Sequence, residues 1–154
     1  PRELRPLMGD WAFGCDICQD VCPVNRKTAT GFDPAFQKRH DFDAPELLPL
    51  LELGDEEFRE RFRNSPIKRA KRVGLQRNVC VALGNLGDAR AVPALSKALV
   101  HDDLVVRLHA AWALGRIGGE VALGHLKFAS EHETDTEVMA EVELSITESE
   151  SSVR

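Results

Sequence analysis

The 154-residue sequence has no tyrosine, few aromatic residues and no apolar run long enough to cross a membrane. Aromatic residues make up 6% of the chain, as 2 Trp and 7 Phe. A membrane-spanning helix needs about 20 consecutive, mainly apolar residues, so we expect no membrane partner. A basic-then-apolar secretory leader is also missing from the sequence, and we therefore expect a reducing, cytoplasmic compartment.

Only four cysteines are present, and their spacing does not suit a disulfide framework. Cys15, Cys18 and Cys22 crowd into eight residues, whereas Cys80 stands alone. Small secreted domains that depend on disulfides are usually dense in cysteine along their whole length. In a reducing compartment, clustered thiols favour metal or redox chemistry instead.

The net charge of −5 argues against a globally basic nucleic-acid-binding protein, but the charges are segregated. Eight basic residues and one acid lie between residues 59 and 77, and eight acids lie in residues 131–154. This pattern is typical of one face for a polyanion and a solvated acidic end. Five cations are the candidates for phosphate contacts: Lys68, Arg69, Lys71, Arg72 and Arg77. The alternative is a solvated helix face whose cations pair with acids of the preceding segment.

The second half of the chain contains an internal repeat. Residues 82–87 read Ala-Leu-Gly-Asn-Leu-Gly, and residues 113–118 read Ala-Leu-Gly-Arg-Ile-Gly, at an offset of 31. A period of this length with two helices per unit is typical of an α-solenoid. The pattern resembles HEAT-type repeats, and a weaker third unit near Val138 suits an end cap. We expect Gly87 and Gly118 to end helices in a left-handed conformation.

The cysteine motif reads C-x2-C-x3-C-P, and several chemistries compete for it. Gln19 follows the second cysteine where a c-type haem site needs His, and a thioredoxin-like pair would leave Cys22 unused. Bacterial two-cluster ferredoxins end a similar run with the same Cys-Pro, which favours iron–sulfur chemistry. A zinc site would need a second ligand pair that the sequence lacks, yet a structural or zinc role stays open because thiolates suit it too.

Three cysteines cannot complete the four-ligand set of a 4Fe-4S cluster. Cys80 is a poor fourth ligand, because it aligns with Ala111 inside the repeat, where a small buried cysteine is a common core residue. We therefore expect the missing ligands upstream of Pro1.

Two stretches together resemble the epoxyqueuosine reductase family. Residues 9–23 read Gly-Asp-Trp-Ala-Phe-Gly-Cys-Asp-Ile-Cys-Gln-Asp-Val-Cys-Pro, and residues 65–72 read Ser-Pro-Ile-Lys-Arg-Ala-Lys-Arg. Val24 departs from the family, which usually carries Trp there. The resemblance implies the C-terminal portion of a cobalamin-dependent, two-cluster iron–sulfur oxidoreductase. That enzyme reduces epoxyqueuosine to queuosine at the wobble position of tRNA.

The same resemblance implies roles for particular residues. Cys15 and Cys18 would bind one 4Fe-4S cluster with cysteines outside this chain, and Cys22 would bind the other cluster. Cobalamin and the catalytic acid would lie upstream, so no catalytic residue is named and the chain alone is expected to be inactive. Independently of the resemblance, the charge pattern assigns the five cations to tRNA phosphates, and we expect a monomer. The electron donor stays unassigned.

The predicted fold class is mainly α: a partial ferredoxin-like iron–sulfur segment followed by HEAT-like α-α repeats. The expected layout is the C-terminal part of a ferredoxin-like 4Fe-4S domain (1–30), a helical connector (31–65), a HEAT-like domain (66–148) and a disordered tail (149–154). In the connector, Asp55 is expected to cap a short helix anchored by Phe58 and Phe62. Two alternative functions remain: a HEAT-like binding scaffold with an incidental cysteine loop, and a ferredoxin-type electron-transfer protein.

Overall fold

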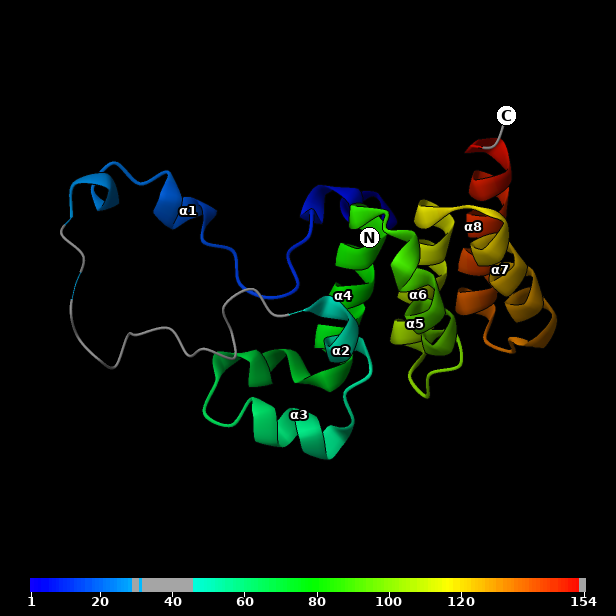
Figure 1. The fold of residues 1–154 in the computed structure, drawn as a ribbon, viewed down its shortest axis with the longest axis horizontal. Coiled ribbons are helices and arrows are strands. Elements are labelled where there is room, and N and C mark those ends of the chain that lie inside the picture. Colours follow the sequence, from blue (N-terminus) through cyan, green and yellow to red (C-terminus); the bar gives the residue numbers. More distant parts are fainter. Residues whose placement is uncertain (29–30, 32–45, 153–154) are drawn as a thin grey trace. The chain divides into compact units, whose positions relative to one another are not determined.

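The computed structural model describes residues 1–28, 31 and 46–152, and these residues form helices and no strand (Figure 1). This confirms the predicted mainly α fold. The α-helices are α1 (Ile17–Asp20), α2 (Leu47–Leu51), α3 (Asp55–Arg61), α4 (Lys71–Leu86), α5 (Val92–Ala98), α6 (Leu104–Ile117), α7 (Glu120–His132) and α8 (Thr136–Ser152). The 3₁₀ turns are η1 (Arg2–Leu4), η2 (Pro6–Met8), η3 (Asn25–Lys27), η6 (Pro66–Ala70) and η7 (Ala89–Ala91).

The chain divides into two compact units. One contains Pro1–Phe13 and Leu47–Arg154, and the other is Gly14–Glu46, which carries the three clustered cysteines. The first 13 residues therefore group with the repeats, whereas the sequence analysis joined them to the cysteine segment. Most of the expected connector, residues 32–45, lies outside the described residues.

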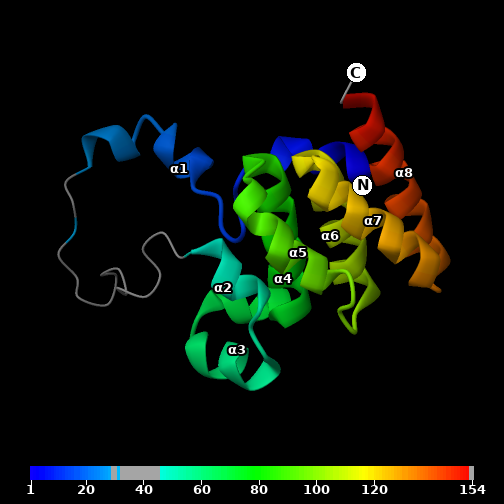
Figure 2. The same cartoon turned by 45° about the vertical axis from the view of Figure 1, so that its right-hand side comes forward.

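The repeat unit consists of paired helices whose first members pack side by side. α4 packs on α6 and α6 on α8, while α5 and α7 are the second helices of their pairs (Figures 1 and 2). Gly84 and Gly115 stand at the repeat offset and lie at these two contacts. A Cβ on Gly84 would meet Trp112 Cζ3 at 2.8 Å, and one on Gly115 would meet Ser145 Cβ at 2.7 Å. Glycine is required at both positions because the neighbouring first helix approaches the backbone directly.

The core lies between these helices. Leu95, Leu114 and Leu126 are fully buried, and Trp112 is 2% exposed. Burying such side chains removes apolar surface from water, which is the main force that holds a helix array together. The Asp103 carboxylate accepts a hydrogen bond from the backbone N–H of Val105 at 2.9 Å and so caps α6.

The turns between helices agree with the sequence analysis in part. Gly87 ends α4 at φ 66° and ψ 19°, the expected left-handed conformation. Gly118 ends α6 with a positive φ of 69° but a ψ of −165°, which is outside the left-handed helical region. Asp55 does not cap α3, because Gly54 holds the extended cap position and its N–H donates to Glu57 Oε2 at 2.9 Å. Asp55 is therefore already the first helical residue.

The end of α8 also differs from expectation. The helix continues through Ser152, beyond residue 149 where a disordered tail was expected. Ser149 is buried, and its hydroxyl donates to the backbone oxygen of Gly115 at 3.1 Å. Residues 153 and 154 lie outside the described residues. None of the described helices combines the length and apolarity that crossing a membrane requires.

Candidate functional site

The three clustered cysteines surround a single helical turn. Cys15 and Cys18 are exposed, Cys22 is half-buried, and none of them forms a disulfide. Backbone hydrogen bonds from Gln19 and Asp20 to the Asp16 oxygen wind this turn, at 2.8 and 2.9 Å. The sequence forms a turn here because Pro23 ends the run and Gly14 before it adopts a positive φ of 75°.

These thiols fit an iron–sulfur cluster as a partial ligand set. None of the three forms a disulfide, so all of them are available as thiolate donors. Among the described residues, no three His, Cys, Asp or Glu side chains gather closely enough to hold a metal ion by themselves. A split set, in which Cys22 serves a different cluster from Cys15 and Cys18, is compatible with that arrangement.

Cys80 belongs to the core. It lies inside α4 with 0% exposure, and burial raises the pKa of its thiol to about 12. A metal ligand must be a thiolate, so this environment disfavours ligation. The expectation that Cys80 is a core residue agrees with its position in the structure.

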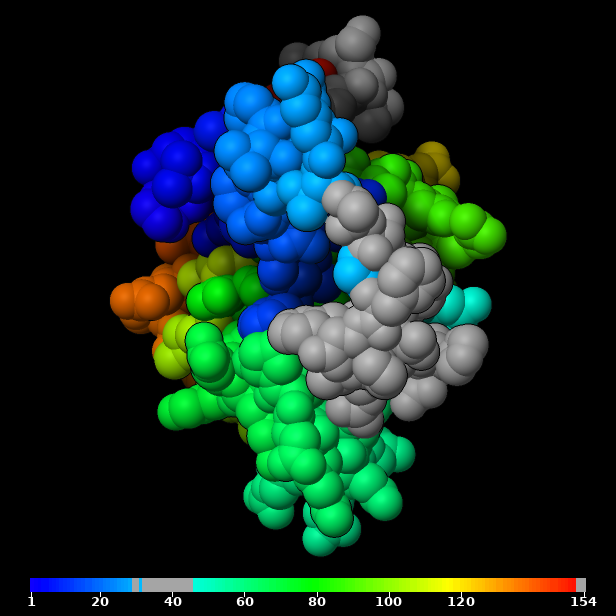
Figure 3. All heavy atoms as spheres, turned by 90° about the vertical axis from the view of Figure 1, so that its left-hand side faces the viewer, coloured from blue at the N-terminus to red at the C-terminus, as the bar shows by residue number. Residues whose placement is uncertain are grey.

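A small cavity between α3 and the start of α4 is lined mainly by cations. The cavity has a volume of about 260 Å³, and its lining consists of Arg59, Lys68, Lys71 and Arg72 together with Asp55 and Phe58. Lys68 and Lys71 are exposed, and their segment lies in the green surface at the bottom of Figure 3. Ser65 starts η6 by accepting a hydrogen bond from the Ile67 N–H, with Pro66 at the first position of the turn. Lys71 adopts a φ of 59°, a positive value that is uncommon for a residue other than glycine.

The remaining predicted cations are placed differently. Arg69 is exposed but does not line this cavity. Arg72 reaches the cavity wall, but its side chain is only 18% exposed; its Nε pairs with Asp55 Oδ1 at 2.6 Å and its Nη1 donates to Gln76 at 3.1 Å. Arg72 therefore follows the alternative expectation, in which a cation of the basic run pairs with an acid of the preceding segment. Arg77 is exposed and donates to Asn78 Oδ1 at 2.8 and 3.0 Å.

Arg59 is the residue that sequence reasoning missed. It belongs to the basic run between residues 59 and 77, but its place on the preceding helix hid its proximity to Lys68 and Lys71. The spacing of four between Phe58 and Phe62 is the sequence signal that could have found it, and in the structure their ring centroids lie 5.0 Å apart. This contact buries one face of α3 and leaves Arg59 on the exposed side.

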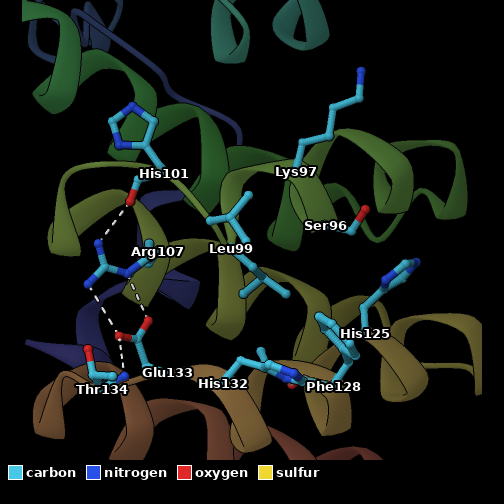
Figure 4. A pocket seen from close by; sticks show the side chains of 12 residues that line it. Ser96, Lys97, Leu99, His101, Arg107, His125, Phe128, His132, Glu133 and Thr134 are labelled. Atoms are coloured by element: carbon cyan, nitrogen blue, oxygen red, sulfur yellow. Dashed lines mark hydrogen bonds and ion pairs between the residues drawn. The ribbon is translucent and has the colours of Figure 1, made fainter.

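A separate, larger cavity lies between α5, α6 and α7 (Figure 4). It has a volume of about 560 Å³ and contains none of the residues that the sequence predicted for a site. Arg107 pairs with Glu133 at 2.8 Å on one wall, and His132 stacks on Phe128 with ring centroids 4.1 Å apart. Burial opposes ionisation of Glu133, but hydrogen bonds from Arg107 and from the backbone of Asp135 and Thr134 outweigh it and lower its pKa.

The fold and the repeat register define the class of this protein first. The sequence model of the HEAT-repeat family matches residues 68–147. The chain therefore belongs to this family.

Relatives of known identity then point to one enzyme family. The chain is 36% identical over 148 residues to the epoxyqueuosine reductase of Bacillus subtilis (strain 168), which covers 95% of this chain and 38% of that protein. It is 43% identical over 119 residues to the epoxyqueuosine reductase of Pseudomonas aeruginosa (strain PAO1), covering 77% of this chain and 33% of that protein.

A solved structure agrees with these sequence matches. A crystal structure of epoxyqueuosine reductase with an epoxyqueuosine-modified tRNA-Tyr stem loop has a TM-score of 0.90 and 34% identity, over 97% of this chain and 40% of that one. The chain thus spans about two fifths of its relatives' length and corresponds to their C-terminal part. The resemblance to the epoxyqueuosine reductase family is confirmed.

Proposed function

We propose that this chain is the cluster-binding and tRNA-contacting part of an epoxyqueuosine reductase. The parent enzyme is an oxidoreductase of tRNA modification that reduces epoxyqueuosine to queuosine at the wobble position with the help of cobalamin. The observation that carries the proposal is the agreement of sequence and fold over nearly the whole chain, with 36% identity over 148 residues and a TM-score of 0.90. An isolated HEAT-like scaffold would not require the cysteine motif in addition.

In this proposal, Cys15 and Cys18 hold one 4Fe-4S cluster together with cysteines outside this chain, and Cys22 contributes to a second cluster. The clusters would supply single electrons for the reduction. The chain's own contribution is to present exposed thiolates on a wound turn and to hold that turn in place. Cobalamin and the proton donor would be bound by the rest of the parent protein, so we assign no catalytic residue here.

The tRNA contact is proposed at the cavity between α3 and α4. Arg59, Lys68 and Lys71 line it, whereas the nearby Arg72 is already paired with Asp55. Cations grouped around a concave site attract a backbone phosphate, and such contacts position a nucleic acid without reading its bases. Arg69 and Arg77 would assist from the adjoining surface. The bound stem loop in the crystal structure of the similar reductase favours tRNA as the polyanion.

The experiment is to express the parent protein anaerobically and to measure its iron, its cobalamin and its conversion of epoxyqueuosine in tRNA. We expect both cofactors and the conversion. A parent that binds neither iron nor cobalamin would contradict the proposal.

The tRNA half is tested on the same preparation. Removing one phosphate-binding cation should reduce the slope of log affinity against log salt by about 1. We therefore expect Lys68→Gln/Lys71→Gln to weaken tRNA binding and to reduce that slope by about 2, with iron content unchanged. Lys127→Gln is the matched control, because Lys127 is an exposed lysine of α7 that pairs with Glu150 at 2.9 Å. Equal slopes in all three proteins would refute this cavity as a tRNA contact.

A further inference from the structure

The first 13 residues, here called the lead segment, bind along the first helices of the repeat through their main chain. Asn85 Nδ2 donates to the backbone oxygens of Arg5 at 2.9 Å and Gly9 at 2.7 Å. Asn78 Nδ2, two turns earlier on α4, donates to the backbone oxygen of Ala12 at 2.9 Å. The two amides therefore fix both ends of residues 5–12 without reference to the side chains that those residues carry.

Two arginines of the lead segment supply the side-chain contacts. Arg5 is 8% exposed; its Nη1 pairs at 3.0 Å with Glu141, which is 6% exposed, and its guanidinium lies 5.7 Å from the ring centroid of Trp112. Arg2 bonds to Glu141 at 2.8 Å and to both carboxylate oxygens of Glu148 at 2.7 Å. The buried Arg5–Glu141 pair favours arginine at this position, because either charge without its partner would be buried and uncompensated. The bidentate contact between Arg2 and Glu148 adds a fixed geometry.

Apolar packing contributes little to this attachment. Its large aliphatic side chains are poorly covered, since Leu4, Leu7 and Met8 are 49%, 79% and 39% exposed. The segment is held instead by three backbone oxygens and two guanidinium groups. Peptide-binding surfaces use the same contacts: side-chain amides donate to the peptide's backbone oxygens, and carboxylates pair with its arginines.

We infer that the face of α4, α6 and α8 formed by Asn78, Asn85, Trp112, Glu141 and Glu148 is a peptide-binding site for an Arg-x-x-Arg segment. The lead segment of the same chain occupies it, as the blue segment beside α4 and α6 shows in Figures 1 and 2. HEAT-type arrays present extended surfaces of this kind to partners. Here the partner is the stretch of chain that precedes the cysteines.

The consequence concerns the cysteine motif, and this part alone rests on the proposed function. Ala12, which Asn78 holds, precedes Cys15 by three residues. Asn78 and Asn85 are thus positioning residues, which fix the point at which the chain leaves the repeats and continues to the first cysteine. The helix that carries the tRNA-contacting cations would then also anchor the chain that leads to the cluster ligands.

The test uses hydrogen–deuterium exchange and peptide binding on this 154-residue chain, so it needs neither iron nor tRNA. We expect Asn78→Ala/Asn85→Ala to accelerate amide exchange in residues 2–13 by about tenfold or more, with α4–α8 still protected. Without the side-chain amides, the lead segment detaches from the repeats without having to break their hydrogen bonds, so it opens more often. Arg5→Glu should do the same. Arg90→Glu is the matched control, since Arg90 is 88% exposed and pairs only locally with Asp88.

A labelled peptide of residues 1–13 supplies the second measurement. We expect it to bind the Arg5→Glu chain, whose site is vacated, and not the wild type; a peptide carrying Arg5→Glu should bind neither. The Asn78→Ala/Asn85→Ala chain keeps the proposal testable if the charge reversal unfolds the repeats. Unchanged exchange in residues 2–13 in that variant, or no peptide binding by a folded Arg5→Glu chain, would overturn the peptide-binding site and leave the proposed reductase function untouched.

Discussion

The tight approach of α4 to α6 yields the sharpest prediction for stability. Gly84 lies inside α4, and a Cβ there would come within 2.8 Å of Trp112 Cζ3 and 2.9 Å of Ala113 Cα. Trp112 is 2% exposed and the second atom is backbone, so neither can move aside cheaply. Overpacking of this kind costs about 1–3 kcal/mol, while replacing glycine by alanine in a helix gains about 1 kcal/mol. The net effect is a destabilisation of up to about 2 kcal/mol for Gly84→Ala.

Gly124 provides the matched control. It lies inside α7 with no atom within 4 Å of the Cβ that alanine would add, so only the helix propensity changes. Gly124→Ala should therefore stabilise the protein by about 1 kcal/mol.

Urea unfolding followed by far-UV circular dichroism measures both changes as shifts of the transition midpoint multiplied by the m-value. The two variants should move the midpoint in opposite directions. If Gly84→Ala were as stable as Gly124→Ala, the helices would not be in backbone contact at this position and the reasoning would fail.

Two further predictions concern titratable groups. Burial lowers the pKa of His109 to about 4, from 6.5, so below pH 6.5 the unfolded chain takes up a proton that the folded chain refuses, and stability present above pH 6.5 declines as the pH falls towards 4. We expect His109→Gln to lose less thermal stability than wild type between pH 7 and pH 5; equal losses would contradict this. Iodoacetamide at pH 8 should alkylate the exposed Cys15 and Cys18 and spare Cys80, whose thiol pKa burial raises to about 12. Intact-mass analysis checks this, and labelling of Cys80 at the rate of Cys15 would be evidence against its burial.

The repeats could be predicted from the sequence because they depend on local periodicity. Ala82 and Ala113 recur at an offset of 31, and both are fully buried. Repeated units bury equivalent faces, so sequence register translates directly into packing. The mainly α fold and the core position of Cys80 follow from the same pattern.

Contacts between distant segments have no comparable signal in the sequence. Arg5 and Glu141 are separated by 136 residues, and no local pattern announces such a pair. The cation cavity was anticipated only in part, because its residues come from two helices while Arg72 turns to Asp55. The α3 cap was misassigned because Gly54 and Asp55 both suit that position, and only the backbone conformation decides between them.

The two glycines at equivalent positions have a geometric effect on the whole array. Gly84 and Gly115 lack a Cβ, which lets successive first helices come into backbone contact. The distance between neighbouring first helices is therefore set at these two glycines. Substitutions elsewhere in the core can therefore loosen or tighten the protein without altering its spacing. The separation between the cations of α4 and the acids of α8 is accordingly a fixed dimension of the protein, set by the two glycines.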